Sequence, residues 1–397
     1  SAFQHYRHNP DDPTSLSDDT VSTFYEDPSG DIWIGTFNGL NRLDRETGRF
    51  THYRHDPNER NTLINDSILA ILPEGEDKMW LATLDGLDLF DPQAGRFTHF
   101  QHREDDPESL PGNEIVELYR DPAGTLWVGT WHNGMASLDP EAWQSGVARF
   151  TSIQHDPDNP QSLSHDGAYT IHRDRSGALW VGTQVGLNRL DEKTGKVKRY
   201  FEKDGLPNNS PVCILEDDDG FLWISTNNGL TRFDPREEQF RNFDVRDGLQ
   251  SNEFDSGACL RTRDGTLVFG GIHGFNAFRP KEIQDNPIPP PVAITGFSVL
   301  NRPVSVDLTG QVPIELSYDE DFVGFDFAAL DYYAPQKNRY AYKLEGLDPN
   351  WVDAGTRRYA SYTSLPAGRY VFRVKGSNSD GVWNESGASI AITVKPP

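Results

Sequence analysis

Along residues 1–280, apolar and polar residues alternate in short runs that recur in groups of four. In the first group the runs read VSTFYED, DIWIGT, GLNRLD and RFTHYRH. Turn-forming sequences separate them, namely DPSG, NG and ETG at residues 27–30, 38–39 and 46–48. Alternation with a period of two, bounded by such turns, predicts four short antiparallel strands in each group, and helical periodicity is absent.

The second run of each group contains a tryptophan at the same place. The aligned positions are Trp33, Trp80, Trp127, Trp180 and Trp223, with Val268 as a sixth, degenerate copy, at spacings of 47, 47, 53, 43 and 45 residues. A period of 40–50 residues is typical of β-propeller blades. Because Ile32 and Ile34 point to one face of the sheet and Trp33 to the other, both faces are apolar and need neighbouring blades to cover them. We therefore expect the tryptophans to be packed between blades rather than to bind a ligand.

The two ends of this array match each other. The chain starts with SAFQHYRHNP, which is similar to a fourth run, and the sixth copy supplies three runs that end in GFNAFRP. A fourth strand from the start, paired beside three from the end, would close a ring of six four-stranded blades and hide its edges. A seven-bladed ring is the alternative. Because the chain begins in the middle of a repeat, we expect it to be a fragment of a longer protein.

A second region follows the repeats. The stretch EIQDNPIPPP contains four prolines and predicts a stiff linker at residues 283–291. After it come alternating strands without the tryptophan phrase, which favour a β-sandwich of the immunoglobulin or fibronectin type. The sequence thus predicts an all-β protein with a β-propeller at residues 1–282 and a β-sandwich at residues 292–397.

The formal net charge is −24, and most of it lies in the repeats. Residues 287–397 contain 12 acidic and 10 basic residues, against 49 and 27 before them. Such a surface repels phosphate backbones and anionic lipids, which argues against nucleic acid and membrane-surface partners. No apolar run of about 18 residues and no signal-peptide pattern occurs. The two cysteines, Cys213 and Cys259, are too few for a disulfide scaffold, and we expect two free buried thiols, with a bridge between neighbouring repeats as the alternative.

Two stretches resemble known families. Residues 205–235, GLPNNSPVCILEDDDGFLWISTNNGLTRFDP, resemble the two-component regulator propeller repeat, and the match recurs across residues 1–280. Residues 340–383 resemble the Y_Y_Y domain that follows such propellers, with Tyr342, Tyr362 and Tyr370 where that family carries its tyrosines.

The resemblance implies the periplasmic sensor region of a bacterial membrane receptor, a hybrid histidine kinase or a diguanylate cyclase, which often responds to oligosaccharides. It also implies that the sandwich relays the signal, with a homodimer through the sandwich as a candidate assembly. Contact with the membrane would come only through regions outside this chain.

The turns between the second and third runs differ from blade to blade, whereas the framework around them repeats. Loops on a rigid scaffold are where binding residues usually lie. The third turn, Trp131-His132-Asn133, is one residue longer than the others and brings together an aromatic face, an imidazole and an amide, which suit a sugar. An alternative is that Trp131 folds back to cap its own blade. The candidate ligand-binding residues are Trp131, His132, Asn133, Phe37, Asn38, Asp85, Gln184, Asn227, Asn228, His273 and, from a loop that leads into a blade, His165.

Metal binding and catalysis have weaker support in the sequence. The pairs His5/His8, His52/His55 and His99/His102 recur on three repeats and cannot converge on one ion. Residues 217–220, DDDG, are similar to part of a calcium loop, but equivalent positions read as plain hairpin turns. Nucleophile elbow, HExxH and phosphate-binding glycine loop motifs are absent from the sequence. We expect no cofactor, no metal and no enzymatic activity in this chain; the alternatives are a protein-docking scaffold and a glycan hydrolase or lyase that uses Asp85 and Glu253.

Overall fold

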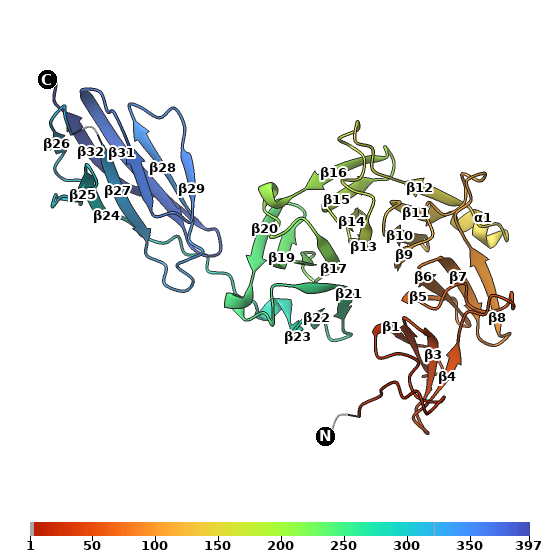
Figure 1. Cartoon of the computed structure of the whole chain (residues 1–397). Coiled ribbons are helices and arrows are strands. Elements are labelled where there is room, and N and C mark those ends of the chain that lie inside the picture. Colours follow the sequence, from red (N-terminus) through yellow and green to blue (C-terminus); the bar gives the residue numbers. More distant parts are fainter. Residues whose placement is uncertain (1–3, 321) are drawn as a thin grey trace. The chain divides into compact units, whose positions relative to one another are not determined.

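The computed structural model describes residues 4–320 and 322–397. The chain divides after Pro280 into two compact units, each built almost entirely of strands (Figure 1). In the part of the chain that the structure describes, no helix is long and apolar enough to cross a membrane.

The first unit consists of six antiparallel sheets, here called blades 1 to 6. Blade 1 contains β1 (Val21–Glu26), β2 (Ile32–Thr36), β3 (Gly39–Asp44) and β4 (Arg49–Tyr53), and blade 2 contains β5 (Ile68–Glu74), β6 (Lys78–Thr83), β7 (Gly86–Asp91) and β8 (Arg96–Phe100). Blade 3 contains β9 (Ile115–Arg120), β10 (Leu126–Thr130), β11 (Met135–Leu138) and β12 (Phe150–Ile153), and blade 4 contains β13 (Ala168–Arg173), β14 (Leu179–Thr183), β15 (Gly186–Asp191) and β16 (Lys196–Tyr200). Blade 5 contains β17 (Pro211–Glu216), β18 (Leu222–Thr226), β19 (Gly229–Asp234) and β20 (Gln239–Phe243), and blade 6 contains β21 (Phe254–Arg261), β22 (Leu267–Gly271) and β23 (Gly274–Phe278). The first strands of successive blades pack in series, β1 on β5 and so on to β17 on β21, which arranges the blades in an arc (Figure 1).

The all-β repeat architecture is confirmed, but two details differ from the expectation. Blade 6 has three strands, and the described residues 4–9 form no strand beside β23; residues 1–3 of the expected closing strand lie outside the described residues. The segment is held at blade 1 instead, where the rings of Tyr6 and Phe50 lie 5.5 Å apart and the backbone N–H of His8 donates to Asp19. Because these contacts fix the segment at the outer edge of blade 1, it does not reach the opposite end of the array.

The tryptophan phrase builds the contacts between blades, as expected. All five tryptophans are buried. Each indole Nε1 also donates a hydrogen bond of 2.7–3.1 Å to a carboxylate six residues earlier: Asp27, Glu74, Asp121, Asp174 and Asp217 respectively. In the turn proposed to be similar to a calcium loop, the other Asp217 oxygen accepts from the backbone N–H groups of Asp219 and Phe221. This carboxylate is therefore occupied by its own turn and by Trp223.

Blade 3 contains a helix that the sequence pattern did not predict. Helix α1 (Pro140–Gln144) lies between β11 and β12, with Asp139 as its N-cap. Its Trp143 packs 5.2 Å from the ring of Trp80 and donates to Glu74. This insertion accounts for the longest repeat spacing, 53 residues between Trp127 and Trp180.

Blades 5 and 6 are joined by a disulfide. Cys213 on β17 and Cys259 on β21 are bonded, with their Cα atoms 6.4 Å apart. The expectation of two free thiols is therefore wrong. Both cysteines lie on first strands, and adjacent blades bring these strands within the distance that a disulfide spans.

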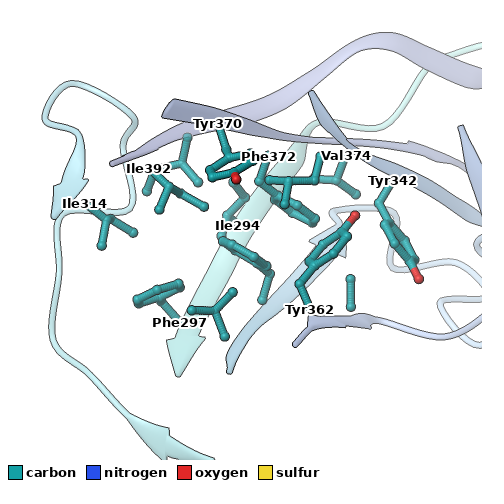
Figure 2. Close-up of a cluster of buried hydrophobic side chains, with 14 of the residues drawn as sticks. Ile294, Phe297, Ile314, Tyr342, Tyr362, Tyr370, Phe372, Val374 and Ile392 are labelled. Carbon is teal, nitrogen blue, oxygen red and sulfur yellow. The ribbon is translucent and has the colours of Figure 1, made fainter. Parts of the chain in front are cut away.

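The second unit is a β-sandwich. One sheet has the order β25-β24-β27-β30 and the other the order β26-β32-β31-β28-β29. The strands are β24 (Val292–Val299), β25 (Arg302–Pro303), β26 (Ile314–Leu316), β27 (Val323–Ala329), β28 (Tyr340–Glu345), β29 (Val352–Gly355), β30 (Tyr359–Tyr362), β31 (Gly368–Ser377) and β32 (Trp383–Val394). Side chains from both sheets form one apolar core (Figure 2).

The three tyrosines named from the sequence lie in or at the border of this core. The Tyr362 hydroxyl donates to Asp348 at 2.6 Å, and the Tyr370 hydroxyl donates to the Pro366 carbonyl at 2.9 Å. Burial is the first cause that raises the pKa of Tyr362, and the bond to Asp348 raises it further. The rings thus fill the core while each phenol keeps a polar partner, which is the arrangement that buried tyrosines need.

Candidate ligand-binding surface

The turns between the second and third strands are here called the tips, and a repeated framework holds them. In blade 1 the Thr36 hydroxyl donates to the Gly39 carbonyl at 2.9 Å, and the same contact recurs at Thr83, Thr130, Thr183 and Thr226. Gly39 has φ +103°, and its backbone N–H donates to the Asp66 carbonyl in the loop that leads into blade 2. A side chain at this glycine would meet the Tyr53 carbonyl, so the position requires glycine. The same backbone bond fixes the tips of blades 3, 4 and 5 against the loops that follow them.

The tip of blade 3 carries the aromatic side chain that the sequence analysis singled out. Trp131 is 41% exposed, and its ring lies 6.0 Å from that of His132 at an interplanar angle of 18°. The backbone N–H of Trp131 donates to the Glu114 carbonyl, and its indole lies near the Tyr169 hydroxyl, whose pKa it lowers. Trp131 is thus held on one side and open to solvent on the other, rather than folded wholly onto its own blade.

The surroundings of this pair are polar. His132 Nε2 lies 3.9 Å from a carboxylate oxygen of Glu114, and both side chains are largely exposed. Burial is the first cause that raises the pKa of Tyr169, so this phenol stays protonated at neutral pH. The cluster of Trp131, His132, Glu114 and Tyr169, here called the blade 3 cluster, offers two stacked rings, a carboxylate and a neutral hydroxyl. Such groups can stack on an apolar ligand face and hydrogen-bond to its hydroxyl groups.

Two members of this cluster, Glu114 and Tyr169, were missed by the sequence analysis. They lie in or just after the loops that lead into blades 3 and 4, on either side of the tip. The turn sequence alone gave no signal for them, because their proximity to Trp131 comes from the packing of one blade on the next. A comparison of these loops at the residues next to each first strand could have found them.

Several predicted site residues are engaged in local structure. Asn133 packs its side chain where a Cβ of Gly112 would lie, and its carbonyl accepts from Gln154. The His165 Nδ1 accepts from the Gly167 backbone, and Asn38 Nδ2 donates to the Ser17 carbonyl. These three side chains are thus engaged in the local structure of the loops.

The remaining predicted residues are spread over the other tips. They are exposed, and they comprise Phe37, Asp85, Gln184, Asn227, Asn228 and His273. Asp85 is 3.4 Å from the amide of Asn113, and the backbone N–H of His273 donates to Gln250. Phe37, Val185 and Ile272 expose large apolar surfaces on three of these tips. These tip residues lie at the same end of the blades as Trp131. The hydrogen bonds and ring contacts of the described residues do not connect them to the blade 3 cluster.

The recurring histidines have a structural role that repeats from blade to blade. The ring Nδ1 of His8, His55, His102 and His155 lies 2.6–2.9 Å from the carbonyl oxygen of the leucine eight residues later, so it carries the proton and donates. The backbone N–H of His55 donates to Asp66, and the other three make the equivalent bond. These side chains fasten the loops between blades. Among the described residues, no group of three or more metal-ligating side chains is arranged to hold an ion.

The fold and this surface define a class of protein: an array of propeller blades with variable tips, followed by a β-sandwich. Comparison with known proteins gives the same assignment. The two-component regulator propeller family matches residues 15–38, 109–132 and 205–228, and the Y_Y_Y domain matches residues 331–395. Three blocks of the first unit therefore carry the two-component regulator propeller repeat, and most of the second unit carries the Y_Y_Y domain.

Relatives with this architecture are longer than the chain. A histidine kinase from Formosa agariphila is 27% identical over 327 residues, which is 68% of this chain and 23% of that protein. The crystal structure of an extracellular domain assigned to a hybrid two-component system of B. thetaiotaomicron has a TM-score of 0.76 and 23% identity, over 96% of this chain and 51% of that one. A second extracellular domain from B. thetaiotaomicron, assigned to a one-component system, has a TM-score of 0.54 and 23% identity, over 98% of this chain and 52% of that one. At this identity the solved structures establish a shared fold.

Proposed function

We propose that this chain is the ligand-sensing part of a bacterial signalling receptor and lies outside the cytoplasm. The observation that carries the proposal is the combination of regulator propeller repeats with a Y_Y_Y domain, which resembles a histidine kinase in sequence and extracellular receptor domains in fold. The disulfide between blades 5 and 6 supports an oxidising compartment such as the periplasm. The output module, a kinase or a cyclase, lies outside this chain.

The ligand that the blade 3 cluster suits best is an oligosaccharide or a similar small polyhydroxylated molecule. Trp131 offers an exposed ring face, while His132, Glu114 and Tyr169 can exchange hydrogen bonds with hydroxyl groups. Binding energy of this kind favours whichever arrangement of the receptor binds the ligand better, and the sandwich is the element that passes the change on.

A thermal-shift screen against plant, algal and glycosaminoglycan oligosaccharides tests this proposal. One glycan should raise the unfolding midpoint in a saturable way, because a ligand that binds only the folded state stabilises it. The variant Trp131→Ala/His132→Ala should lose the shift, whereas the matched tip variant Phe37→Ala should keep it. Chromatography of the bound glycan should recover it unchanged. A new, shorter product would instead favour the hydrolase or lyase alternative.

A second candidate function rests on the exposed apolar tips. Phe37, Val185 and Ile272 lie at the same end of the blades as Trp131, and such a surface also fits a protein partner. The docking function replaces the glycan-sensing one under two conditions. No glycan shifts the unfolding midpoint, and Phe37→Ser and Ile272→Ser abolish capture of a receptor partner while Trp131→Ala leaves that capture unchanged.

A further inference from the structure

Blades 1 and 4 have nearly the same third strand and following turn. The stretch GLNRLDRETG of blade 1 and the stretch GLNRLDEKTG of blade 4 place Arg42 and Arg189 at equivalent positions. Each guanidinium carbon lies over the indole of its own blade, 5.6 Å from the ring centroid of Trp33 and 5.7 Å from that of Trp180. Because the framework around the two arginines is the same, a difference in their partners is one that the fold does not require.

The carboxylate that neutralises this arginine is present in blade 1 and missing in blade 4. Arg42 forms an ion pair with Asp31, which stands two residues before the tryptophan of that blade. The equivalent residue of blade 4 is Ala178, two residues before Trp180. A methyl group cannot neutralise a guanidinium, so the charge of Arg189 is not balanced at this position.

The other charged side chains at this end of the blades differ in the same direction. Seven positions around the arginine can be compared, because the strand registers of the two blades are the same. In blade 1 three of them are basic and three are acidic: Arg42, Arg45 and Arg49, and Glu26, Asp31 and Glu46, with Thr51 as the seventh. In blade 4 five are basic and one is acidic: Arg173, Arg189, Lys193, Lys196 and Lys198, and Glu192, with Ala178 as the seventh. The balanced charge of blade 1 thus becomes positive in blade 4, although the region before residue 287 has 49 acidic and 27 basic residues.

The five basic residues of blade 4 line a cavity of about 900 Å³. The cavity lies beside the turns at residues 176–178 and 191–196, at the opposite end of the strands from the tips. Its two carboxylates are already engaged. Asp191 accepts from a hydroxyl group and a backbone N–H of its own turn, and Glu192 pairs with Arg173 at 2.6 Å.

Three cations of the cavity remain without such a partner. Lys198 pairs with Glu238 of blade 5, whereas the ion pairs of the described residues include none with Arg189, Lys193 or Lys196. At an ionic strength of about 0.1 M the field of distant charges fades over roughly 10 Å, so the negative charge of the whole chain does not cancel these three. Basic side chains that meet around a concave surface suit an oxyanion, which accepts charge-assisted hydrogen bonds from them.

We propose that this cavity binds the oxyanion groups of an anionic ligand, sulfate or phosphate, through Arg189, Lys193 and Lys196. The Arg189 guanidinium lies over the Trp180 ring and can donate two parallel hydrogen bonds to one such group, while the lysines act as point charges. Cavities of roughly 300–1,000 Å³ hold ligands larger than a single ion, which favours a ligand with several such groups, for example a sulfated oligosaccharide. The cavity is on another blade than the blade 3 cluster and at the other end of the strands, so the proposal does not rest on the function of that cluster.

Isothermal titration calorimetry of the 397-residue chain at low ionic strength tests the proposal with two probes, inorganic sulfate and a heparin-derived tetrasaccharide. Ala178→Asp introduces the carboxylate of blade 1 next to Arg189 and should weaken binding about tenfold or more, because one charge-assisted contact is lost. Lys193→Glu, which gives the turn the residue of blade 1, should weaken binding as well. The control Thr51→Asp adds a negative charge to the equivalent surface of blade 1 and should leave the affinity within about twofold. Because blade 1 already accommodates both carboxylates, the unfolding midpoints of the variants should match that of the unsubstituted chain.

Binding that Ala178→Asp and Lys193→Glu weaken supports the proposal, and the two probes then identify the source of the oxyanion. Equal affinities indicate a free ion, whereas a much tighter tetrasaccharide indicates a sulfated oligosaccharide. The proposal is overturned if neither probe binds, or if both variants bind as the unsubstituted chain does. The variant Trp131→Ala/His132→Ala should keep its affinity for both probes. A loss in that variant alone would place the anionic ligand at the tips and would also overturn the proposal.

Discussion

Trp180 and Trp131 differ in their surroundings. Trp180 is buried between blades 4 and 5, whereas Trp131 is exposed on the tip of blade 3. Trp180 belongs to a pattern that repeats five times, with its indole bonded to Asp174 and its ring against Phe233 of the next blade. Trp131 occurs once, in the single tip with an inserted residue. A side chain that recurs in register serves the framework, and a side chain that departs from it is free to bind. The predictions below test this distinction.

The largest difference should come from truncating the two tryptophans. Trp180→Ala leaves a large cavity between two blades and should lower the free energy of unfolding by about 3–5 kcal/mol. Trp131→Ala removes a half-exposed ring and should change it by less than about 0.5 kcal/mol. Urea denaturation measures both values. Equal losses would show that Trp131 belongs to the framework after all.

Removing the disulfide should have the second largest effect on the free energy of unfolding. The double variant Cys213→Ala/Cys259→Ala should lose about 2–4 kcal/mol of unfolding free energy, because the bond restricts a 46-residue loop in the unfolded chain. Adding a reductant to the wild type should produce a similar loss, and adding it to the double variant should change nothing. An unchanged wild type under full reduction would contradict a stabilising role for the bond.

A half-buried glutamate between blades 3 and 4 gives a dependence on pH. Glu117 on β9 accepts a long hydrogen bond of 3.4 Å from the Ile171 backbone of blade 4, and burial raises its pKa to about 8. Because the folded state raises this pKa, the folded protein holds the proton more tightly than the unfolded chain. The contribution to the free energy of unfolding is complete below the unfolded pKa and is lost as the pH rises through about 8. Glu117→Gln should therefore raise the unfolding free energy at pH 8.5 by about 2 kcal/mol and change it little at pH 4. Unfolding curves at the two pH values measure this, with Glu114→Gln as the exposed control.

The smallest effect concerns a substitution inside the repeat itself. Asp88 occupies the position in blade 2 that Asn41 occupies in blade 1 and Asn188 in blade 4. One of its carboxylate oxygens lies 2.5 Å from Nδ1 of His99. The bond to Asp88 raises the pKa of His99, so this pair stabilises the fold below the unfolded histidine pKa and loses the effect as the pH rises through the folded one. Asp88→Asn introduces the asparagine that blades 1 and 4 have at this register and should reduce this pH dependence. Unfolding curves between pH 5.5 and 8.5 measure it. If the pH dependence stays, other groups cause it.

The period-two pattern and the recurring tryptophan were enough to predict the blades and the sandwich, because each strand's faces are dictated by its own residues. The indole–carboxylate bonds were not predicted, although a carboxylate stands six residues before the tryptophan in each of the five repeats that have one. Asp27 and Asp217 also form ordinary turns, and a turn residue alone does not reveal a second partner.

Features that depend on how one blade meets the next could not be obtained from the sequence. The Cys213–Cys259 bond forms because two first strands lie side by side. Likewise, blade 6 keeps three strands because residues 4–9 pack on blade 1, and the sequence does not show this packing. The same holds for the surface around Trp131, since Tyr169 reaches it from blade 4. Whether the predicted tip residues bind a ligand stays a prediction.

The disulfide also decides how the array responds to a pulling force. A load applied at Pro280 passes through β23 and β22 to β21, and at Cys259 the covalent bond transfers it directly to Cys213 on β17. The strands β18, β19 and β20 lie between the two cysteines in the chain and carry none of it. Under tension from the C-terminal side, residues 260–280 can be pulled out directly, whereas residues 214–258 bear no load along their backbone.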